Sequence, residues 1–324
     1  MSAITRIDSQ SGEQPFDYDR AFSRNIGLVS RGEQARLRGA TVALAGLGGV
    51  GGIHLMTLAR AGIGSFRLAD FDAFELHNFN RQAGATLSSV DRPKLDVMAE
   101  IAYDINPELR IERFEQGVTE ENVEAFVRGA DMVVDGIDFF AVDARALLHR
   151  TAERFGVPVV AAGPLGFSTA YLLFVPGGMR WDDYFAMDLA KNDFERFLLF
   201  ALGNAPAGTQ TPYWDPRELR LDEKRGPSFG LAAQLCAGVV CAEVLKQVLG
   251  RGDVYAAPYY HQFDAYRCVY IRRKLRGGNR AWSQRLRFLL LRELYQEDDL
   301  REAFSDALAP ESQGLGRKVA LAKV

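Results

Sequence analysis

A glycine-rich turn is the segment whose residue types point most directly to chemistry. It lies between the apolar run 41–45 and a helical pattern near 52–61. Its glycines are Gly46, Gly48, Gly49 and Gly51. Glycines allow a tight turn and let phosphate approach the backbone, while the free amides and dipole of a following helix attract negative charge. The G-x-G-x-x-G spacing in this context predicts a phosphate-binding site.

Acidic residues follow the next predicted strand, 65–69, in the order Asp70-Phe-Asp72. Asp70 lies nineteen residues after Gly51, at a position where a carboxylate can accept hydrogen bonds from ribose hydroxyls. The glycine turn and this carboxylate together predict that the phosphate belongs to a nucleotide.

Three further charged residues, Arg81, Lys94 and Asp138, follow predicted strands or begin the helix after one. In a doubly wound sheet such segments gather at the carboxyl ends of the strands, so we expect these residues to converge with Asp70. Two cations and a spare carboxylate suit a triphosphate with its Mg²⁺. A hydride-transfer site needs a nicotinamide pocket and does not need this set of cations, so the pattern disfavours a dehydrogenase.

The first half of the chain alternates strands with helices. The predicted strands are 41–45, 65–69, 109–114, 131–135 and 157–162. The predicted helices between them are 52–61, 93–104, 119–128 and 141–155. This alternation predicts an α/β protein with a doubly wound, mostly parallel sheet. Before it, Ser30 and Glu33 have the spacing of a helix capping box.

The pattern changes in the second half. Strand-like runs at 170–175, 259–263 and 267–272 predict an antiparallel extension of the sheet. Helical patterns cover 181–202, 229–249 and about 282–304, and the polar stretch 203–228 reads as a long loop. Loops of that length in a compact domain usually cover a site or bind a partner.

Composition favours a cytoplasmic location. The chain has 324 residues and a net charge of −3, so nothing in its charge favours a membrane or a nucleic acid as an obligatory partner. No signal peptide is visible in the polar, acidic first twenty residues. The apolar run 229–240 is too short to span a bilayer. Three cysteines without close pairs are typical of a reducing compartment.

The order and spacing of these motifs resemble the ThiF/MoeB/HesA family, the prokaryotic relatives of ubiquitin-activating enzymes. The resemblance spans roughly 20–250 and rests most specifically on Asn78-Phe-Asn80-Arg81-Gln82, which follows the Asp-x-Asp strand end. Pro93-Lys94 and the Asp135-x-x-Asp138 element follow in the same order. The resemblance implies a Rossmann-like fold, ATP binding, and adenylation of a carboxylate with release of pyrophosphate.

The resemblance also implies roles for individual residues. Asp70 corresponds to the ribose ligand, and Asp138 to the Mg²⁺ carboxylate. The positions that correspond to phosphate ligands are Asn78, Arg81 and Lys94. Asp72 and Gln82, inside the same motifs, are further candidates for nucleotide binding.

Arg24 matches an arginine that dimeric relatives extend into the neighbouring subunit's ATP site. A homodimer, with Arg24 acting in trans, is therefore expected.

The candidate residues also suit the adenylation of a carboxylate when the family resemblance is left aside. An acceptor carboxylate and the α-phosphate are both negatively charged, so cations must reduce their repulsion and stabilise the departing pyrophosphate. A carboxylate is already ionised at neutral pH, so no general base is required. Positioning and positive charge should make up most of the site.

The sequence departs from many relatives in its cysteines. It lacks paired Cys-x-x-Cys ligands, and we predict no structural zinc. Cys236, Cys241 and Cys268 are interpreted as packing residues. Without a thioester-forming cysteine, the enzyme should stop at the acyl-adenylate or pass it to an amine, a sulfide or an internal nucleophile.

These features favour a three-part organisation: a flexible N-terminal arm over 1–19, an ATP-binding adenylyltransferase domain over 20–275, and a basic, amphipathic C-terminal extension over 276–324. The loop 203–228 is the candidate cover of the acceptor site. The favoured acceptor is the C-terminal carboxylate of a small carrier protein or peptide.

Three other functions stay open. The first is a tRNA-modifying dehydratase, which the basic stretch 272–287 favours slightly. The second is a nucleotide-binding scaffold without catalysis. The third, more distant, is an NAD-dependent oxidoreductase.

Overall fold

The computed structural model describes residues 15–213 and 226–294, and all structural statements refer to these two ranges. The strands form one sheet in the order β3-β2-β1-β4-β5-β6-β7-β8. Its parallel part consists of β1 (Thr41–Ala45), β2 (Ser65–Ala69), β3 (Arg110–Phe114), β4 (Met132–Asp135) and β5 (Val159–Leu165). Its antiparallel part consists of β6 (Ser168–Phe174), β7 (Tyr259–Asp264) and β8 (Val269–Lys274). The predicted fold class is confirmed.

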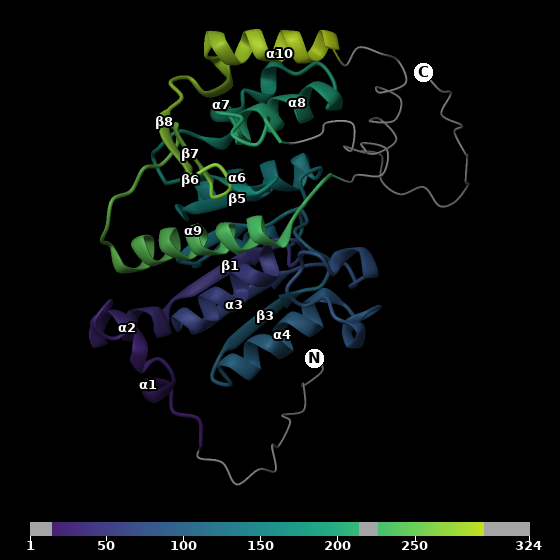
Figure 1. Cartoon of the computed structure of the whole chain (residues 1–324). Coiled ribbons are helices and arrows are strands. Elements are labelled where there is room, and N and C mark those ends of the chain that lie inside the picture. The colour runs from purple at the N-terminus through teal and green to yellow at the C-terminus, as the bar shows by residue number, and fades with distance from the viewer. Residues whose placement is uncertain (1–14, 214–225, 295–324) are drawn as a thin grey trace.

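Helices connect the strands and surround the sheet (Figure 1). In the first half they are α1 (Tyr18–Ala21), α2 (Arg31–Gly39), α3 (Gly51–Ala61), α4 (Lys94–Ile105), α5 (Val123–Val127) and α6 (Val142–Arg154). In the second half they are α7 (Trp181–Phe185), α8 (Asp193–Asn204), α9 (Gly230–Leu249) and α10 (Trp282–Leu294). The capping box of Ser30 and Glu33 is confirmed at the start of α2.

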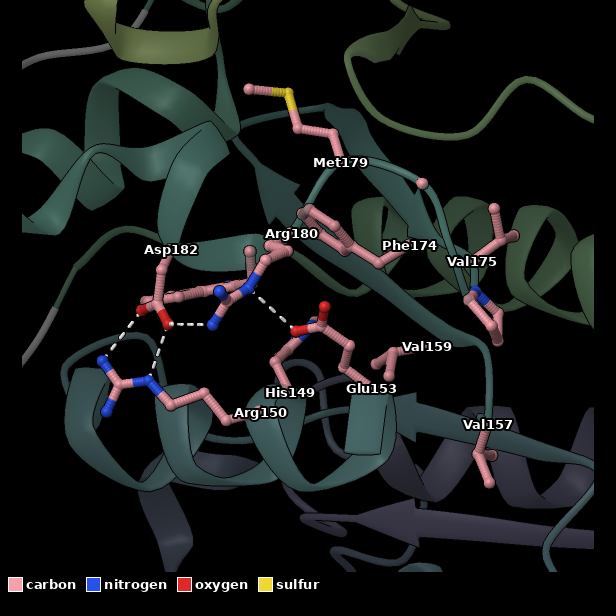
Figure 2. A pocket seen from close by; sticks show the side chains of 13 residues that line it. His149, Arg150, Glu153, Val157, Val159, Phe174, Val175, Met179, Arg180 and Asp182 are labelled. Atoms are coloured by element: carbon pink, nitrogen blue, oxygen red, sulfur yellow. Dashed lines mark hydrogen bonds and ion pairs between the residues drawn. The ribbon is translucent and has the colours of Figure 1, made fainter. Parts of the chain in front are cut away.

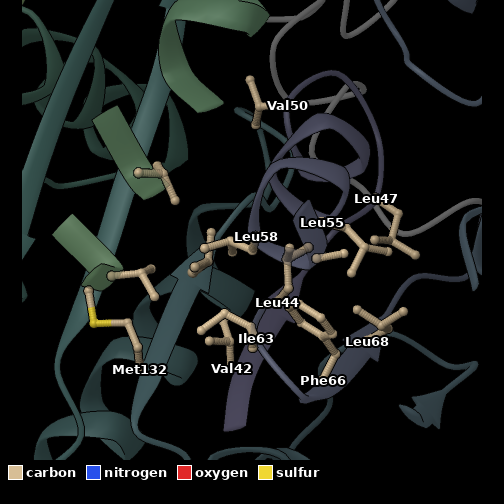
Figure 3. Packing of buried hydrophobic residues seen from close by; sticks show 14 of the residues in the cluster. Val42, Leu44, Leu47, Val50, Leu55, Leu58, Ile63, Phe66, Leu68 and Met132 are labelled. Atoms are coloured by element: carbon tan, nitrogen blue, oxygen red, sulfur yellow. The ribbon is translucent and has the colours of Figure 1, made fainter. Parts of the chain in front are cut away.

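The central strands are apolar because both faces of the sheet are covered. Side chains alternate between the faces of a strand. Val42 and Leu44 of β1 belong to a cluster with α3, α4 and α9, part of which Figure 3 shows. Ala43 and Ala45 belong to a second cluster with α5 and α6. Burial on both faces explains why β1 reads as an uninterrupted apolar run.

The order of the strands places a crevice beside β1. Its neighbours are β2 and β4, and the connections after these two strands leave in opposite directions along the sheet. Ligands of doubly wound sheets bind at such a switch point, outside the carboxyl ends of the strands. We call the edge at which β1, β2, β4 and β5 end the carboxyl edge.

The helix predicted over 119–128 is shorter than expected. Its first part is a turn in which the amide of Thr119 donates to Oδ1 of Asn122 at 2.8 Å, and α5 begins only at Val123. Asparagine side chains favour such local turns over helix.

The last predicted strand, 267–272, begins later than expected. The chain turns between β7 and β8, with Cys268 at a φ of 55° and the amide of Arg267 donating to Oδ1 of Asp264 at 2.9 Å. Cys268 is exposed in this turn, so its interpretation as a packing residue is wrong. Cys236 is buried, which confirms packing there.

Helix α9 is long and apolar enough to cross a bilayer by length and composition alone. Here it packs along β5, β6 and α3, and Ala233, Cys236 and Val240 join the core cluster that contains Val42. A core helix of this kind passes the same compositional test, so the cytoplasmic location stays a prediction.

Parts of the predicted organisation lie outside the described residues: 1–14 of the arm, 214–225 of the long loop, and the end of the C-terminal extension. Tyr18, predicted to lie in the arm, is buried in α1, and its hydroxyl donates to the Gly62 carbonyl at 2.5 Å. Helix α10 packs against α8 through Phe288, at the end of the molecule away from α1 (Figure 1).

Candidate active site

The glycine turn is fitted tightly against the chain that leaves β4. Gly46 has a φ of +87°, and a Cβ on it would overlap the carbonyl of Gly136. A Cβ on Gly51 would overlap the carbonyl of Gly46. Only glycine satisfies both restrictions. The turn therefore brings the start of α3 and the segment after β4 together at the carboxyl edge.

Asp70 fixes the shape of this turn. Its Oδ2 accepts from the amide of Leu47 at 2.6 Å, and its Oδ1 accepts from the amide of Asp72 at 2.8 Å. Burial raises the pKa of Asp70, and these two amide bonds oppose that rise. The carboxylate can still accept further hydrogen bonds, because each oxygen has two lone pairs. Its role as a ribose ligand stays a prediction.

Lys94 lies buried beside the turn with Asp72 as its partner. The Nζ atom is 2.9 Å from Oδ2 of Asp72, and the Lys94 side chain is 7% exposed against 51% for Asp72. The amide of Lys94 also donates to the Asp72 carbonyl at 2.8 Å. This double link sets the start of α4 and the direction of the lysine side chain.

Three predicted ligands meet at the middle of the turn. A Cβ placed on Gly48 would lie 4.0 Å from Nζ of Lys94 and 3.8 Å from Nε2 of Gln82. A Cβ placed on Gly49 would lie 3.7 Å from Nε of Arg81. An ammonium, a guanidinium and an amide thus surround a stretch of backbone that carries no side chain, which leaves a place for an anion.

Arg81 and Gln82 lie in a turn held by Asn78. The Asn78 side chain is 3% exposed, its Oδ1 accepts from the amide of Glu75, and its carbonyl accepts from the amides of Arg81 and Gln82. The Arg81 guanidinium donates to the His77 carbonyl at 2.9 Å and to Oδ1 of Asn80 at 3.0 Å. In this structure Asn78 therefore supports the two residues that face the glycines.

The side chain of Gln82 contains a buried polar atom without a hydrogen-bond partner. Its side chain is buried, and within the described residues its Oε1 has no hydrogen-bond partner. A buried acceptor left without a donor costs about 1–3 kcal/mol, so this oxygen needs a donor such as a water molecule. The other end of the same amide, the donor Nε2, is the atom that faces Gly48 beside Lys94.

Asp138 lies on the chain that leaves β4 and is exposed. Its Oδ1 accepts from the amide of Phe140 at 2.9 Å, and Oδ2 has no partner within the described ranges. It follows Gly136, whose backbone contacts Gly46, so it lies on the same side of the sheet as the glycine turn. No group of three or more potential metal ligands occurs in the part of the chain that the structure describes. The Mg²⁺ role of Asp138 stays a prediction.

Two buried residues near this segment were not predicted from the sequence to take part in the site. Arg145 Nε and His149 Nε2 lie 2.8 and 3.0 Å from Oδ2 of Asp135, and Arg145 also donates to the carbonyls of Ile137 and Asp138. Burial tends to raise the pKa of Asp135, but the Arg145 and His149 side chains offset it and bring the pKa to about 2. This cluster holds the segment that carries Asp138.

A pocket lies beside His149, lined by residues of α6, β5, β6 and α7 (Figure 2). Ion pairs of Arg150 with Asp182 and of Arg180 with Glu153 border it. The glycines, Arg81 and Lys94 do not line it. The candidate active site is instead the cluster of Arg81, Gln82 and Lys94 around the glycine turn at the carboxyl edge.

Arg24 lies far from the glycine turn of its own chain. It is exposed in the short helix Ser23–Asn25, and Asn25 beside it donates to the Ala61 carbonyl at the opposite end of α3. Within the described residues Arg24 has no hydrogen-bond or ion-pair partner. This placement agrees with a role toward another subunit and gives none in its own site.

Burial raises the pKa of the Cys236 thiol to about 12 and that of the Cys241 thiol to about 11. Both are poor nucleophiles at neutral pH, because the thiolate is the reactive form. Cys268 is the exposed cysteine among the described residues.

Several curated proteins are similar to this chain. HesA from the heterocysts of Trichormus variabilis is 34% identical over 165 residues, which are 50% of this chain and 61% of HesA. The tRNA threonylcarbamoyladenosine dehydratase of Bacillus subtilis is 41% identical over 118 residues, 36% of this chain and 46% of the relative. The ThiS adenylyltransferase of Escherichia coli is 31% identical over 157 residues, 48% and 62% of the two chains. These matches span about half the length of the relatives.

Solved structures share the fold over a larger part of the chain. PaaA has a TM-score of 0.62 at 19% identity and covers 82% of this chain and 85% of its own. Escherichia coli MccB, crystallised with AMPCPP and MccA, has a TM-score of 0.59 at 19% identity, covering 82% and 74%. At these identities the likeness concerns the fold. The ThiF family model matches residues 22–281, most of the chain, and the protein is therefore a member of the ThiF family.

Proposed function

We propose that this chain is an ATP-dependent adenylyltransferase that activates a carboxylate as an acyl-adenylate. The observation that carries the proposal is the meeting of Arg81 Nε, Lys94 Nζ and Gln82 Nε2 around Gly48 and Gly49. This cluster offers two cations and free backbone to a polyphosphate, at the switch point of a doubly wound sheet. Family membership supports the same activity.

In the reaction an oxygen of the acceptor carboxylate attacks the α-phosphorus of ATP. A bond forms between that oxygen and phosphorus, the bond from phosphorus to the bridging oxygen breaks, and pyrophosphate leaves with its electrons. No proton has to move. Arg81 and Lys94 reduce the repulsion between the two anions and stabilise the charge that develops on pyrophosphate.

The remaining residues of the site position the nucleotide. The start of α3 and the amides of Gly48 and Gly49 bind phosphate oxygens, and Asp70, which already fixes the turn, accepts from the ribose. Asn78 holds the turn that carries Arg81 and Gln82. Asp138 would hold Mg²⁺ through its available oxygen, and the bound ion would neutralise part of the phosphate charge.

Asp72 acts through Lys94. In the free protein its carboxylate is the counter-charge that makes a buried ammonium tolerable. A bound phosphate takes over part of that task, because it approaches the same Nζ atom from the side of Gly48. Lys94 therefore needs little movement to engage ATP.

The acceptor is the terminal carboxylate of a small carrier protein or peptide. Relatives that support this choice are the ThiS adenylyltransferase, whose name gives a sulfur carrier protein as substrate, and MccB crystallised with MccA. The position of the basic stretch also disfavours RNA. Arg272, Arg273 and Lys274 lie at the end of β8 that pairs with the start of β7, at the opposite edge of the sheet from the glycine turn.

A tRNA-modifying dehydratase is the second candidate. The observation that favours it is the 41% identity to the Bacillus subtilis tRNA threonylcarbamoyladenosine dehydratase. In that case the activated carboxylate belongs to a modified nucleoside. A protein of this kind should bind tRNA with an affinity that falls steeply with added salt.

We also propose a homodimer in which Arg24 reaches the partner's site, as well as the division into 20–275 and a C-terminal extension. Without a thioester step, the acyl-adenylate passes directly to its final nucleophile. Incubation with ATP and acceptor should then leave no thiol-sensitive covalent adduct, and such an adduct would overturn this part of the proposal.

ATP–pyrophosphate exchange tests the activity directly. We expect exchange that depends on an acceptor when carrier proteins, carboxyl-terminal peptides and tRNA carrying threonylcarbamoyladenosine are supplied in turn. Arg81→Ala should lower the exchange rate about a hundredfold or more. Arg60→Ala, an exposed arginine at the other end of α3, should leave it unchanged. No exchange with any of the three acceptor classes would contradict the proposal.

A further inference from the structure

Four aromatic side chains gather at the carboxyl edge, next to the candidate active site. We call them the aromatic platform: Phe167, Tyr213, Phe229 and Tyr266. The ring of Phe167 lies 5.1 Å from Tyr213, 5.5 Å from Phe229 and 5.1 Å from Tyr266, centroid to centroid. The four residues come from four separate segments of the chain. Phe229 is 55% exposed and Tyr266 is 68% exposed, so the platform presents ring surface to the outside.

Hydrogen bonds hold the Tyr213 ring of the platform in place. The Tyr213 hydroxyl donates to Oδ2 of Asp264 at 2.8 Å and accepts from the amide of Phe167 at 3.2 Å. Asp264 is fully buried. Gly166 has a φ of +61°, and a Cβ on it would lie 2.6 Å from the Tyr213 ring, so the ring packs directly on the backbone of the turn between β5 and β6. Fixed rings bind with little loss of conformational entropy.

Hydrogen bonds link the platform to the phosphate-binding residues. Phe229 follows Ser228, whose carbonyl accepts from Nδ2 of Asn80 at 2.8 Å. Oδ1 of Asn80 in turn accepts from the Arg81 guanidinium at 3.0 Å. Ser228 also pairs with Gly166 in a short parallel bridge. Asn80 thus connects the platform to Arg81, the arginine that we propose to contact the phosphates.

We propose that the aromatic platform receives a bulky apolar or aromatic side chain of the acceptor, a few residues before the carboxylate that is adenylated. This inference rests on the proposed function, because the carboxylate must lie beside Arg81 while the preceding chain crosses the platform. Exposed aromatic rings favour such side chains through area burial and ring–ring contact. An acceptor whose tail carries only small residues would leave the platform uncovered.

The charges of the described residues around the platform favour a peptide over RNA. Among the described residues, Arg267 follows Tyr266 directly, and its guanidinium already donates to the Thr209 carbonyl at 2.9 Å. The neighbouring carboxylate, Asp264, is buried and also accepts from the amide of Arg267. Single-stranded RNA on stacked rings requires cations along its backbone, and the basic end of β8 lies at the opposite edge of the sheet.

A series of fluorescent synthetic peptides of equal length tests the proposal. Each ends in a free carboxylate, and a single phenylalanine is moved along an otherwise Ser-Gly sequence. Anisotropy in the presence of a non-hydrolysable ATP analogue gives the affinity of each peptide. We expect one position of the phenylalanine to tighten binding about tenfold over the peptide without it.

Substitutions in the platform test whether the preference for phenylalanine arises there. Tyr266→Ala and Phe229→Ala should each remove most of the tenfold advantage and leave the affinity for ATP unchanged. Trp282→Ala, which removes an 80% exposed ring on α10, should keep the advantage. Equal binding of all peptides, or a phenylalanine advantage that survives Tyr266→Ala and Phe229→Ala, overturns the proposal. So does a tRNA transcript that loses its affinity in those two variants.

The same peptides separate this inference from the proposed function. A phenylalanine preference that depends on Tyr266, combined with no ATP–pyrophosphate exchange on any peptide or protein acceptor, supports the docking site and contradicts the adenylation. Exchange without such a preference supports the adenylation and contradicts the docking site.

Discussion

An ion pair lies at or beyond the carboxyl end of each of the strands β2 and β4, and the two pairs are built differently. After β2, Lys94 is buried and its partner Asp72 is 51% exposed. After β4, Asp135 is 0% exposed and its partners Arg145 and His149 are 7% and 2% exposed. The first pair keeps one open side and the second is enclosed by protein.

The difference separates a charge that meets a ligand from charges that hold the chain. Lys94 faces the glycine turn, where a phosphate can join or replace Asp72. The Asp135 cluster satisfies its members internally and fixes the segment that carries Asp138. Substitutions at the first pair should therefore change nucleotide binding, and substitutions at the second should change stability.

Arg145→Met should have the largest effect. It leaves the Asp135 carboxylate buried with only His149 and a backbone amide beside it, which should lower the free energy of unfolding by about 3–5 kcal/mol. Urea denaturation measures the change. Arg150→Met on the same helix removes an exposed pair with Asp182 and should cost at most about 1 kcal/mol. Equal losses in the two variants would contradict a larger stabilising role for the enclosed cluster of Asp135, Arg145 and His149.

Lys94→Met should affect activity more than stability. Its removal takes one of two cations from the phosphates, so the exchange rate should fall about a hundredfold. The fold should persist, because methionine fills the same buried space and Asp72 can turn to solvent. Steady-state exchange assays, with circular dichroism to confirm folding, check both parts. A variant that keeps full activity would remove Lys94 from the site.

Acidification should weaken the enclosed cluster. The pKa of Asp135 is lowered to about 2 from its ordinary value of 3.8. Its ionisation therefore stabilises the fold fully above about pH 4, and this contribution disappears as the pH falls toward 2. The stability difference between the wild type and Asp135→Asn should shrink by about 2 kcal/mol over that range. Urea titrations at several pH values measure it, and a constant difference would contradict the assignment.

Asp72→Asn should have the smallest effect, and it should depend on the ligand. The free protein should lose about 1 kcal/mol of stability, because Asp72 is half exposed and water screens its attraction to Lys94. Bound ATP should restore most of that loss, so the rise in melting temperature on adding ATP should exceed that of the wild type. Glu100→Gln, which breaks the exposed pair of Glu100 on α4 with Arg92, should show no such dependence.

Much of the fold follows from the sequence for simple reasons. The ranges predicted for β1 and β2 are confirmed residue for residue, because each strand ends at a residue that breaks the pattern, Gly46 after β1 and Asp70 after β2. The glycine spacing likewise predicts a turn whose tight packing the structure shows at Gly46 and Gly51.

The enclosed cluster could not be predicted in the same way. Arg145 and His149 read as polar positions of an amphipathic helix, and only the packing of α6 on β4 turns them toward Asp135. The aromatic platform was not predicted for a similar reason. Its rings come together only when the antiparallel strands and the start of α9 are packed. Contacts between distant segments depend on packing that no local pattern records.

Calorimetric titration with ATP and Mg²⁺, compared with NAD, tests the central claim most directly. We predict that ATP binds, that NAD does not compete with it, and that both Arg81→Ala and Lys94→Met weaken ATP binding. Preferential binding of NAD, or unchanged ATP affinity in both variants, would contradict the assignment of this crevice to a triphosphate.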